Sequence, residues 1–187
     1  MNEEIEIIKE ETTDRMQGAV KHLDTELSKL RAGKATPTLL DGITVDYYGV
    51  NTPLSQVSNI NTPDAKSVII QPWEKSLLGA IEKAILAANI GLTPINNGEI
   101  IRINVPPLTE ERRSQLVKMV KNEGESAKIS IRNARKWAND ELKRLLKEGL
   151  SEDAEKIAED EVQELTDEYI KKVDNVVEAK EADIMTV

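Results

Sequence analysis

The 187-residue sequence contains no cysteine and only one histidine, His22. Disulfides, thiolate nucleophiles and cysteine-ligated zinc are therefore excluded, and the composition is typical of a reducing compartment. It also has no phenylalanine, and aromatic residues make up only 3% of the chain. Because base stacking needs exposed rings, binding of single strands by stacking is not expected, and the core must be aliphatic.

Long apolar runs are also lacking. None approaches the roughly 18 residues that cross a bilayer, and the chain begins MNEE, which is acidic where a signal peptide would be basic. We therefore expect a cytoplasmic protein that is neither exported nor inserted in a membrane.

Catalytic patterns are missing as well. The glycines show no phosphate-binding spacing, no nucleophile and base can be paired, and no group of residues has the spacing of a metal site. His22 lies next to the apolar Leu23, which favours a surface or core-edge role over catalysis. The sequence thus predicts no enzyme activity, no metal and no cofactor.

Three long segments carry apolar residues at steps of three, four or seven, the pattern of helices with one buried face. The first covers about residues 5–30. The second follows Pro106 and Pro107, has Thr109 as its N-cap and continues for about 39 residues to Lys147. The third follows Gly149, which ends the second helix, and has Ser151 as its cap. Because each face alone would be exposed to water, we expect one three-helix bundle.

The segment between the first two helices has a different pattern. It contains one helical stretch, Glu74–Asn89, and Thr36 before Pro37 predicts the N-cap of a short helical turn. The rest consists of short β-type runs separated by turn residues. These runs are Ile43–Tyr48, Leu54–Ile60, Ser67–Gln71 and Ile100–Val105.

These patterns predict an α+β protein of two domains. A long three-helix bundle comprises residues 1–30 and 106–187, and a small α/β domain of residues 31–105 is inserted after the first helix. The two connections, near residues 31–36 and 104–107, are predicted hinges, with Gly33 loosening the first and Pro106 and Pro107 stiffening the second. A fixed contact between the domains is the alternative.

Positive charge is concentrated on one element of an acidic protein. The formal net charge is −9, yet residues 102–147 hold 12 basic and 6 acidic side chains, whereas residues 148–187 hold 4 and 14. At about 100° per residue, four cations of the second helix lie within about 60° of one another beside its apolar face, and three others widen the band. The four are Lys121, Lys128, Arg132 and Arg135, and the three are Lys118, Lys136 and Lys143.

Segregated cations on a rigid helix are suited to docking on the phosphates of a nucleic acid. The alternative is a solvated face whose cations are paired with Glu125, Asp140 or the acidic third helix. Trp137 lies beyond the cations toward the polar side of the helix, where packing between helices is favoured over base stacking.

Four segments resemble the bacterial ribosome recycling factor family, and the similarity spans the whole chain. They are LRAGKA at 30–35, LLDGITVDYYG at 39–49, PPLTEERR at 106–113 and IRNAR at 131–135. One departure is Trp137, because family members usually have a polar residue there.

The resemblance implies an L-shaped, monomeric, non-enzymatic translation factor similar in outline to transfer RNA. It implies binding to the 70S ribosome after termination, with the bundle on large-subunit rRNA, and dissociation of the subunits together with elongation factor G and GTP. By motif, Arg113, Arg132 and Arg135 are the implied RNA contacts and Arg31 lies at the hinge; Lys121 and Lys128 are added by helical position. A helical-bundle adaptor that binds other proteins without RNA is the alternative.

Overall fold

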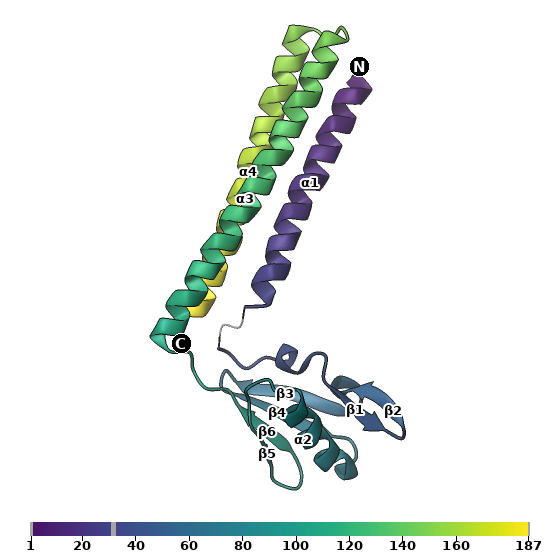
Figure 1. Ribbon diagram of the computed structural model, residues 1–187, viewed down its shortest axis with the longest axis vertical. Helices are drawn as coiled ribbons and strands as arrows, with labels where there is room; N and C mark the ends of the chain where they lie inside the picture. The colour runs from purple at the N-terminus through teal and green to yellow at the C-terminus, as the bar shows by residue number, and fades with distance from the viewer. Residues whose placement is uncertain (1, 31–32, 187) are drawn as a thin grey trace. The chain divides into compact units, whose positions relative to one another are not determined.

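The computed structural model describes residues 2–30 and 33–186 (Figure 1). The chain divides into two compact units, one formed by residues 1–32 and 109–187 and the other by Gly33–Leu108. Three long helices make up the first unit, and strands with one short α-helix make up the second. The predicted fold class, a helical bundle with an inserted domain that contains a β-sheet, is confirmed.

The bundle consists of α1 (Asn2–Ser28), α3 (Glu110–Lys147) and α4 (Glu152–Met185), which run side by side along their length (Figure 1). With 38 residues, α3 is about 57 Å long at 1.5 Å per residue. Both predicted caps are present. The Thr109 hydroxyl accepts a hydrogen bond from the backbone N–H of Arg112 (3.1 Å), and the Ser151 hydroxyl accepts one from Ala154 (3.2 Å).

The bundle core follows the three apolar stripes. At the end that holds the α3–α4 turn, Ile5 and Ile8 of α1 pack into a cluster with residues of α3, the turn and α4. Two buried threonines, Thr12 and Thr166, donate their hydroxyls to the carbonyls four residues earlier, at 2.6 and 2.7 Å, so neither hydroxyl is left unpaired. The other members of the cluster are Ala138, Leu142, Leu145, Leu150, Ala158 and Val162.

The second unit contains a hairpin and a four-stranded antiparallel sheet. Strands β1 (Thr44–Tyr47) and β2 (Val50–Pro53) form the hairpin. The sheet has the order β3-β4-β6-β5, with β3 (Ser58–Asp64), β4 (Ser67–Pro72), β5 (Pro94–Asn96) and β6 (Ile101–Asn104).

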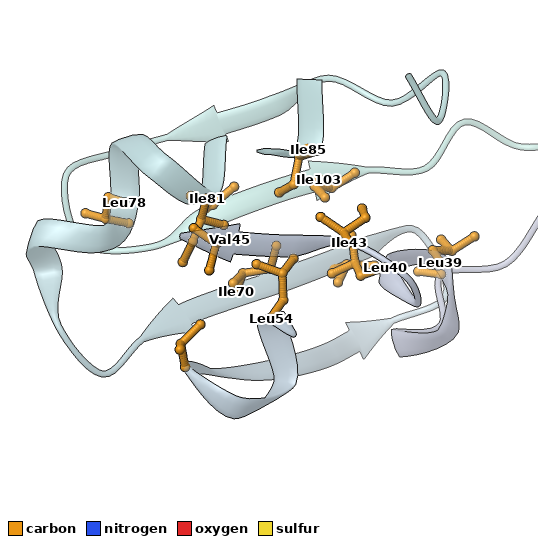
Figure 2. Packing of buried hydrophobic residues seen from close by; sticks show 14 of the residues in the cluster. Leu39, Leu40, Ile43, Val45, Leu54, Ile70, Leu78, Ile81, Ile85 and Ile103 are labelled. Carbon is orange, nitrogen blue, oxygen red and sulfur yellow. The ribbon is translucent and has the colours of Figure 1, made fainter. Parts of the chain in front are cut away.

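Helix α2 (Leu78–Ala87) covers the core of this unit. Its Leu78, Ile81 and Ile85 point into the same apolar cluster as Ile70 of β4 and Ile103 of β6 (Figure 2). Four of these five side chains are fully buried, and Leu78 is nearly so. An aliphatic core therefore suffices for a sheet this small, as expected from the lack of phenylalanine.

Several predicted boundaries in this unit are wrong. The run Leu54–Ile60 begins with a 3-10 turn, Leu54–Gln56, because the Ser58 hydroxyl bonds the Leu54 carbonyl at 2.6 Å and closes a turn before β3. The helix predicted for Glu74–Asn89 also starts late, since a 3-10 turn at Lys75–Leu77 precedes α2. Ala88, near the end of the predicted range, is exposed. Strands β2 and β5 were not predicted at all.

The first predicted hinge contains a packed glycine. Gly33 has φ +74°, and a Cβ added to it would lie 2.5 Å from Cγ of Leu108. Glycine is therefore required here for close packing as well as for its backbone conformation. Further on, Thr36 takes the N-cap position of the 3-10 helix Pro37–Leu40, as predicted. Arg31 lies outside the described residues.

Candidate nucleic-acid interface

Seven basic residues of α3 form two rows. We call Arg113, Lys121, Lys128 and Arg135 the seam row, because they lie beside α4, and Arg132, Lys136 and Lys143 the outer row. The rows differ by only a small rotation around one helix. Their surroundings differ much more.

Lys128 is a partly buried member of the seam row. Its side chain is 19% exposed, and its Nζ lies 2.6 Å from Oδ1 of Asp174 on α4 and 3.7 Å from Oε1 of Glu125. The hydrogen bond to Asp174 raises the pKa of Lys128, although desolvation partly opposes the shift. Lys128 is therefore a cation paired with the acidic third helix, as the alternative interpretation predicted for the basic residues of α3.

Arg135 and Arg113 also have partners on α4. Nη1 of Arg135 donates to Oε1 of Gln163 (3.2 Å), and Nη1 of Arg113 donates to the backbone carbonyl of Met185 (3.2 Å). Both partners are uncharged, so each guanidinium keeps its full positive charge and further donors. These arginines are positioned by α4 rather than neutralised by it.

Lys121 lies between these contacts, on a shallow groove between α3 and α4. The groove is also lined by Lys118 of α3 and by Glu178 and Glu181 of α4. One carboxylate oxygen of Glu181, Oε1, is buried and has no hydrogen-bond partner among the described residues. Acidic and basic side chains thus face each other along the groove.

The outer row is open to solvent. Arg132, Lys136 and Lys143 are all exposed, and within the part of the chain that the structure describes none has a hydrogen bond or ion pair. All the donors of these residues are therefore available to an external anion. The structure thus brings the seven cations together on one side of α3 but leaves only some of them free.

The opposite side of α3 faces α1 and has a different character. Trp137 is half-buried against the apolar cluster at that end of the bundle, and the guanidinium of Arg15 lies 4.0 Å from its ring centroid. Glu11 in turn pairs with Arg15 at 2.6 Å. The prediction that Trp137 packs between helices is confirmed. His22 is exposed, as predicted.

Two residues of the seam were not predicted. Gly124 is buried in the middle of α3, and a Cβ added to it would lie 2.6 Å from Cγ2 of Val177 on α4. Asp174 was only one of many carboxylates in the sequence. A glycine inside a helical pattern was the available signal for close helix packing, whereas nothing in the sequence distinguishes Asp174 from its neighbours.

The described residues contain neither a metal-binding cluster nor a membrane-spanning helix. Over residues 2–30 and 33–186, no three His, Cys, Asp or Glu side chains are grouped to hold a metal ion. Within the same ranges, no helix is both long and apolar enough to span a bilayer. Of the predicted hinge residues, Pro106 and Pro107 are exposed and Gly33 is half-buried.

Comparison with known proteins gives a consistent result over the full length. The family model described as ribosome recycling factor matches residues 23–185. The ribosome-recycling factor of Flavobacterium johnsoniae is 59% identical over 187 residues, covering 100% of both chains, and that of Porphyromonas gingivalis is 55% identical over 185 residues, covering 98% of this chain and 100% of the relative.

Two solved structures agree with these relatives. A solution structure of the ribosome recycling factor has a TM-score of 0.76 and 39% identity, with 98% of each chain covered. A second structure contains models for the T. thermophilus ribosome recycling factor and the E. coli elongation factor G bound to the E. coli post-termination complex. Its matching chain has a TM-score of 0.62 and 44% identity, and 97% of this chain and 99% of that one are covered.

Proposed function

Because the chain belongs to the ribosome recycling factor family, we propose that it binds the 70S ribosome after termination and, with elongation factor G and GTP, promotes separation of the subunits. Full-length identity of 59% to a ribosome-recycling factor supports this. So does the 44% identity to a factor whose structure includes elongation factor G and a post-termination complex. The family consists of translation factors that are not enzymes, so GTP hydrolysis belongs to the partner.

The proposal assigns contact with large-subunit rRNA to α3. The observation that carries it is Arg132, which is exposed, has no partner among the described residues and lies in the IRNAR segment. A free guanidinium donates two parallel hydrogen bonds to a phosphate, and a rigid helix holds it in place without the cost of ordering a loop. Arg113, Lys121, Lys128 and Arg135 extend this surface along the seam row.

The two connections between the units are proposed hinges. Gly33 with the preceding Arg31 belongs to one connection, and Pro106 with Pro107 belongs to the other. Short two-stranded connections of this kind allow a domain to move as one body. The protein acts as a cytoplasmic monomer in this proposal.

Recycling is tested directly with post-termination ribosomes, elongation factor G and GTP. We expect the protein to accelerate subunit dissociation, measured as a fall in light scattering. The control omits elongation factor G and gives no acceleration. If the complete mixture also shows none, the proposed function is wrong.

The RNA contact is tested by binding to isolated large subunits. Replacing Arg132 with glutamine (Arg132→Gln) removes a charge-assisted hydrogen bond, so we expect affinity to fall about 10- to 100-fold. The plot of log affinity against log salt should also become shallower by roughly 0.7–0.9, the effect of one phosphate contact. Lys171→Gln is the matched control, because Lys171 is an exposed residue of α4 with no described partner.

The same salt titration distinguishes the proposed RNA contact from the alternative, a helical-bundle adaptor that binds only other proteins. A protein that binds only other proteins would show no affinity for the large subunit's RNA and little salt dependence. Equal affinities and slopes for Arg132→Gln and Lys171→Gln would remove Arg132 from the contact surface.

A further inference from the structure

The Lys128–Asp174 pair has the properties of a contact that is exchanged rather than permanent. The Lys128 side chain is 19% exposed, whereas Asp174 is 56% exposed, so the ion pair is open to solvent on its carboxylate side. Lys128 lies between Arg132 and Lys121 on the basic side of α3. A phosphate that approaches this surface therefore meets a lysine that already holds an anion.

The close packing of α3 and α4 places the carboxylate there. Gly124 is one turn before Lys128, and its missing side chain leaves the space that Val177 fills, one turn after Asp174. With any larger residue at position 124, the Val177 side chain or the helices themselves would have to shift, since the added Cβ would lie 2.6 Å from Cγ2 of Val177. The short distance between Lys128 and Asp174 depends on this approach.

We propose that Asp174 is a built-in competitor for RNA phosphate at Lys128, which lowers the affinity of the α3 surface for RNA. This inference rests on the proposed function and deepens it. When RNA docks, a phosphate oxygen takes the place of the Asp174 carboxylate at the Lys128 ammonium, and no covalent bond changes. Lys128 then contributes only the difference between the two ion pairs, while Arg132 contributes its full contact.

The strength of the competition follows from the exposure of the pair. Ion pairs open to solvent contribute about 0.2–1 kcal/mol, which corresponds to a factor of up to about fivefold in affinity. A factor that must leave the ribosome after each round gains from a weaker hold, because differences in affinity appear mainly as differences in dissociation rate. One carboxylate of the acidic third helix, Asp174, thus lowers the affinity for RNA in this proposal.

The test is binding of Asp174→Asn to isolated large subunits. Losing the carboxylate leaves Lys128 with only the longer contact to Glu125 (3.7 Å), so we expect about two- to fivefold tighter binding. The salt slope should stay nearly unchanged, because the number of phosphate contacts is the same in both proteins. The matched control is Glu164→Gln, which removes the same charge from an exposed residue of α4 that has no described partner. Circular dichroism of each variant verifies that the bundle remains folded.

A double-mutant cycle shows whether the effect passes through Lys128. Lys128→Gln should weaken binding only slightly in the wild-type protein but about two- to fivefold more when Asp174 is already asparagine. The proposal is overturned if Asp174→Asn binds no more tightly than Glu164→Gln, or if the two substitutions at 128 and 174 are additive. The proposed function fails separately, when the wild-type protein does not accelerate subunit dissociation in the presence of elongation factor G and GTP.

Discussion

Two cations of α3 that are only four residues apart have opposite surroundings. Lys128 in the seam row is mostly covered and bound to Asp174, whereas Arg132, four residues later, is exposed without a partner among the described residues. The difference comes from α4, which packs against one row only. A neighbouring helix, rather than the composition of α3 itself, therefore decides which cations remain available to an external anion.

The largest expected effect is a loss of stability when Gly124, which packs against Val177 of α4, is replaced. Gly124→Ala places a Cβ 2.6 Å from Val177, so we expect the bundle to lose about 1–2 kcal/mol of unfolding free energy, even though alanine favours helices. Urea denaturation followed by circular dichroism measures the change. With the helices apart, the Lys128–Asp174 pair should lengthen, and the seam row should become more like the outer row.

Gly18→Ala is the matched control for that substitution. Gly18 is an exposed residue of α1, and nothing lies within 4 Å of a Cβ added there. Alanine should therefore stabilise the helix by about 0.5–1 kcal/mol. If Gly124→Ala stabilised the protein as much as Gly18→Ala does, the close approach of α3 and α4 would be disproved.

A smaller effect on stability distinguishes a residue of the seam row from one of the outer row. Lys128→Gln should lower the free energy of unfolding by about 0.2–1 kcal/mol, because it removes an ion pair, whereas Lys136→Gln in the outer row should change it by less. Repeating the urea titrations in 1 M NaCl should shrink the difference, since salt screens the partly exposed pair. Equal losses for both variants would mean that the seam pair contributes nothing to folding.

The smallest expected effect is on pH dependence. The pKa of Lys128 is raised above 10.5, mainly by the hydrogen bond to Asp174, so its contribution to stability is complete below pH 10.5 and lost as the pH rises through the raised value. The stability gap between wild type and Lys128→Gln, a few tenths of a kcal/mol, should therefore be present at pH 8 and shrink as the pH rises through the raised pKa. A gap that widens at high pH would contradict the assignment.

Much of the bundle could be predicted because its signals are local. Thr109 and Ser151 cap helices through bonds to residues three positions away, and the apolar periodicity of α3 and α4 is long enough to be unambiguous. The basic side of α3 followed from the same periodicity. Local patterns on a long helix therefore gave both the fold class and the candidate surface.

What was missed depends on neighbours that the sequence does not specify. Strands β2 and β5 have only four and three residues, and each contains a proline, so neither has a detectable alternation of its own. They are held in place by pairing with β1 and β6. In the bundle, helical angles placed Lys128 beside the apolar stripe, but only the packing of α4 on that side shows that Asp174 reaches it.

The environment of Trp137 has a practical consequence for following the two units separately. Each unit contains one tryptophan, and Trp73 in the sheet domain is 64% exposed, whereas Trp137 is half-buried beneath Arg15. Intrinsic fluorescence will therefore carry a red-shifted component from one unit and a blue-shifted component from the other. A chain in which Trp73 is replaced by phenylalanine reports on the helices alone, so melting of the two halves can be recorded without any attached dye.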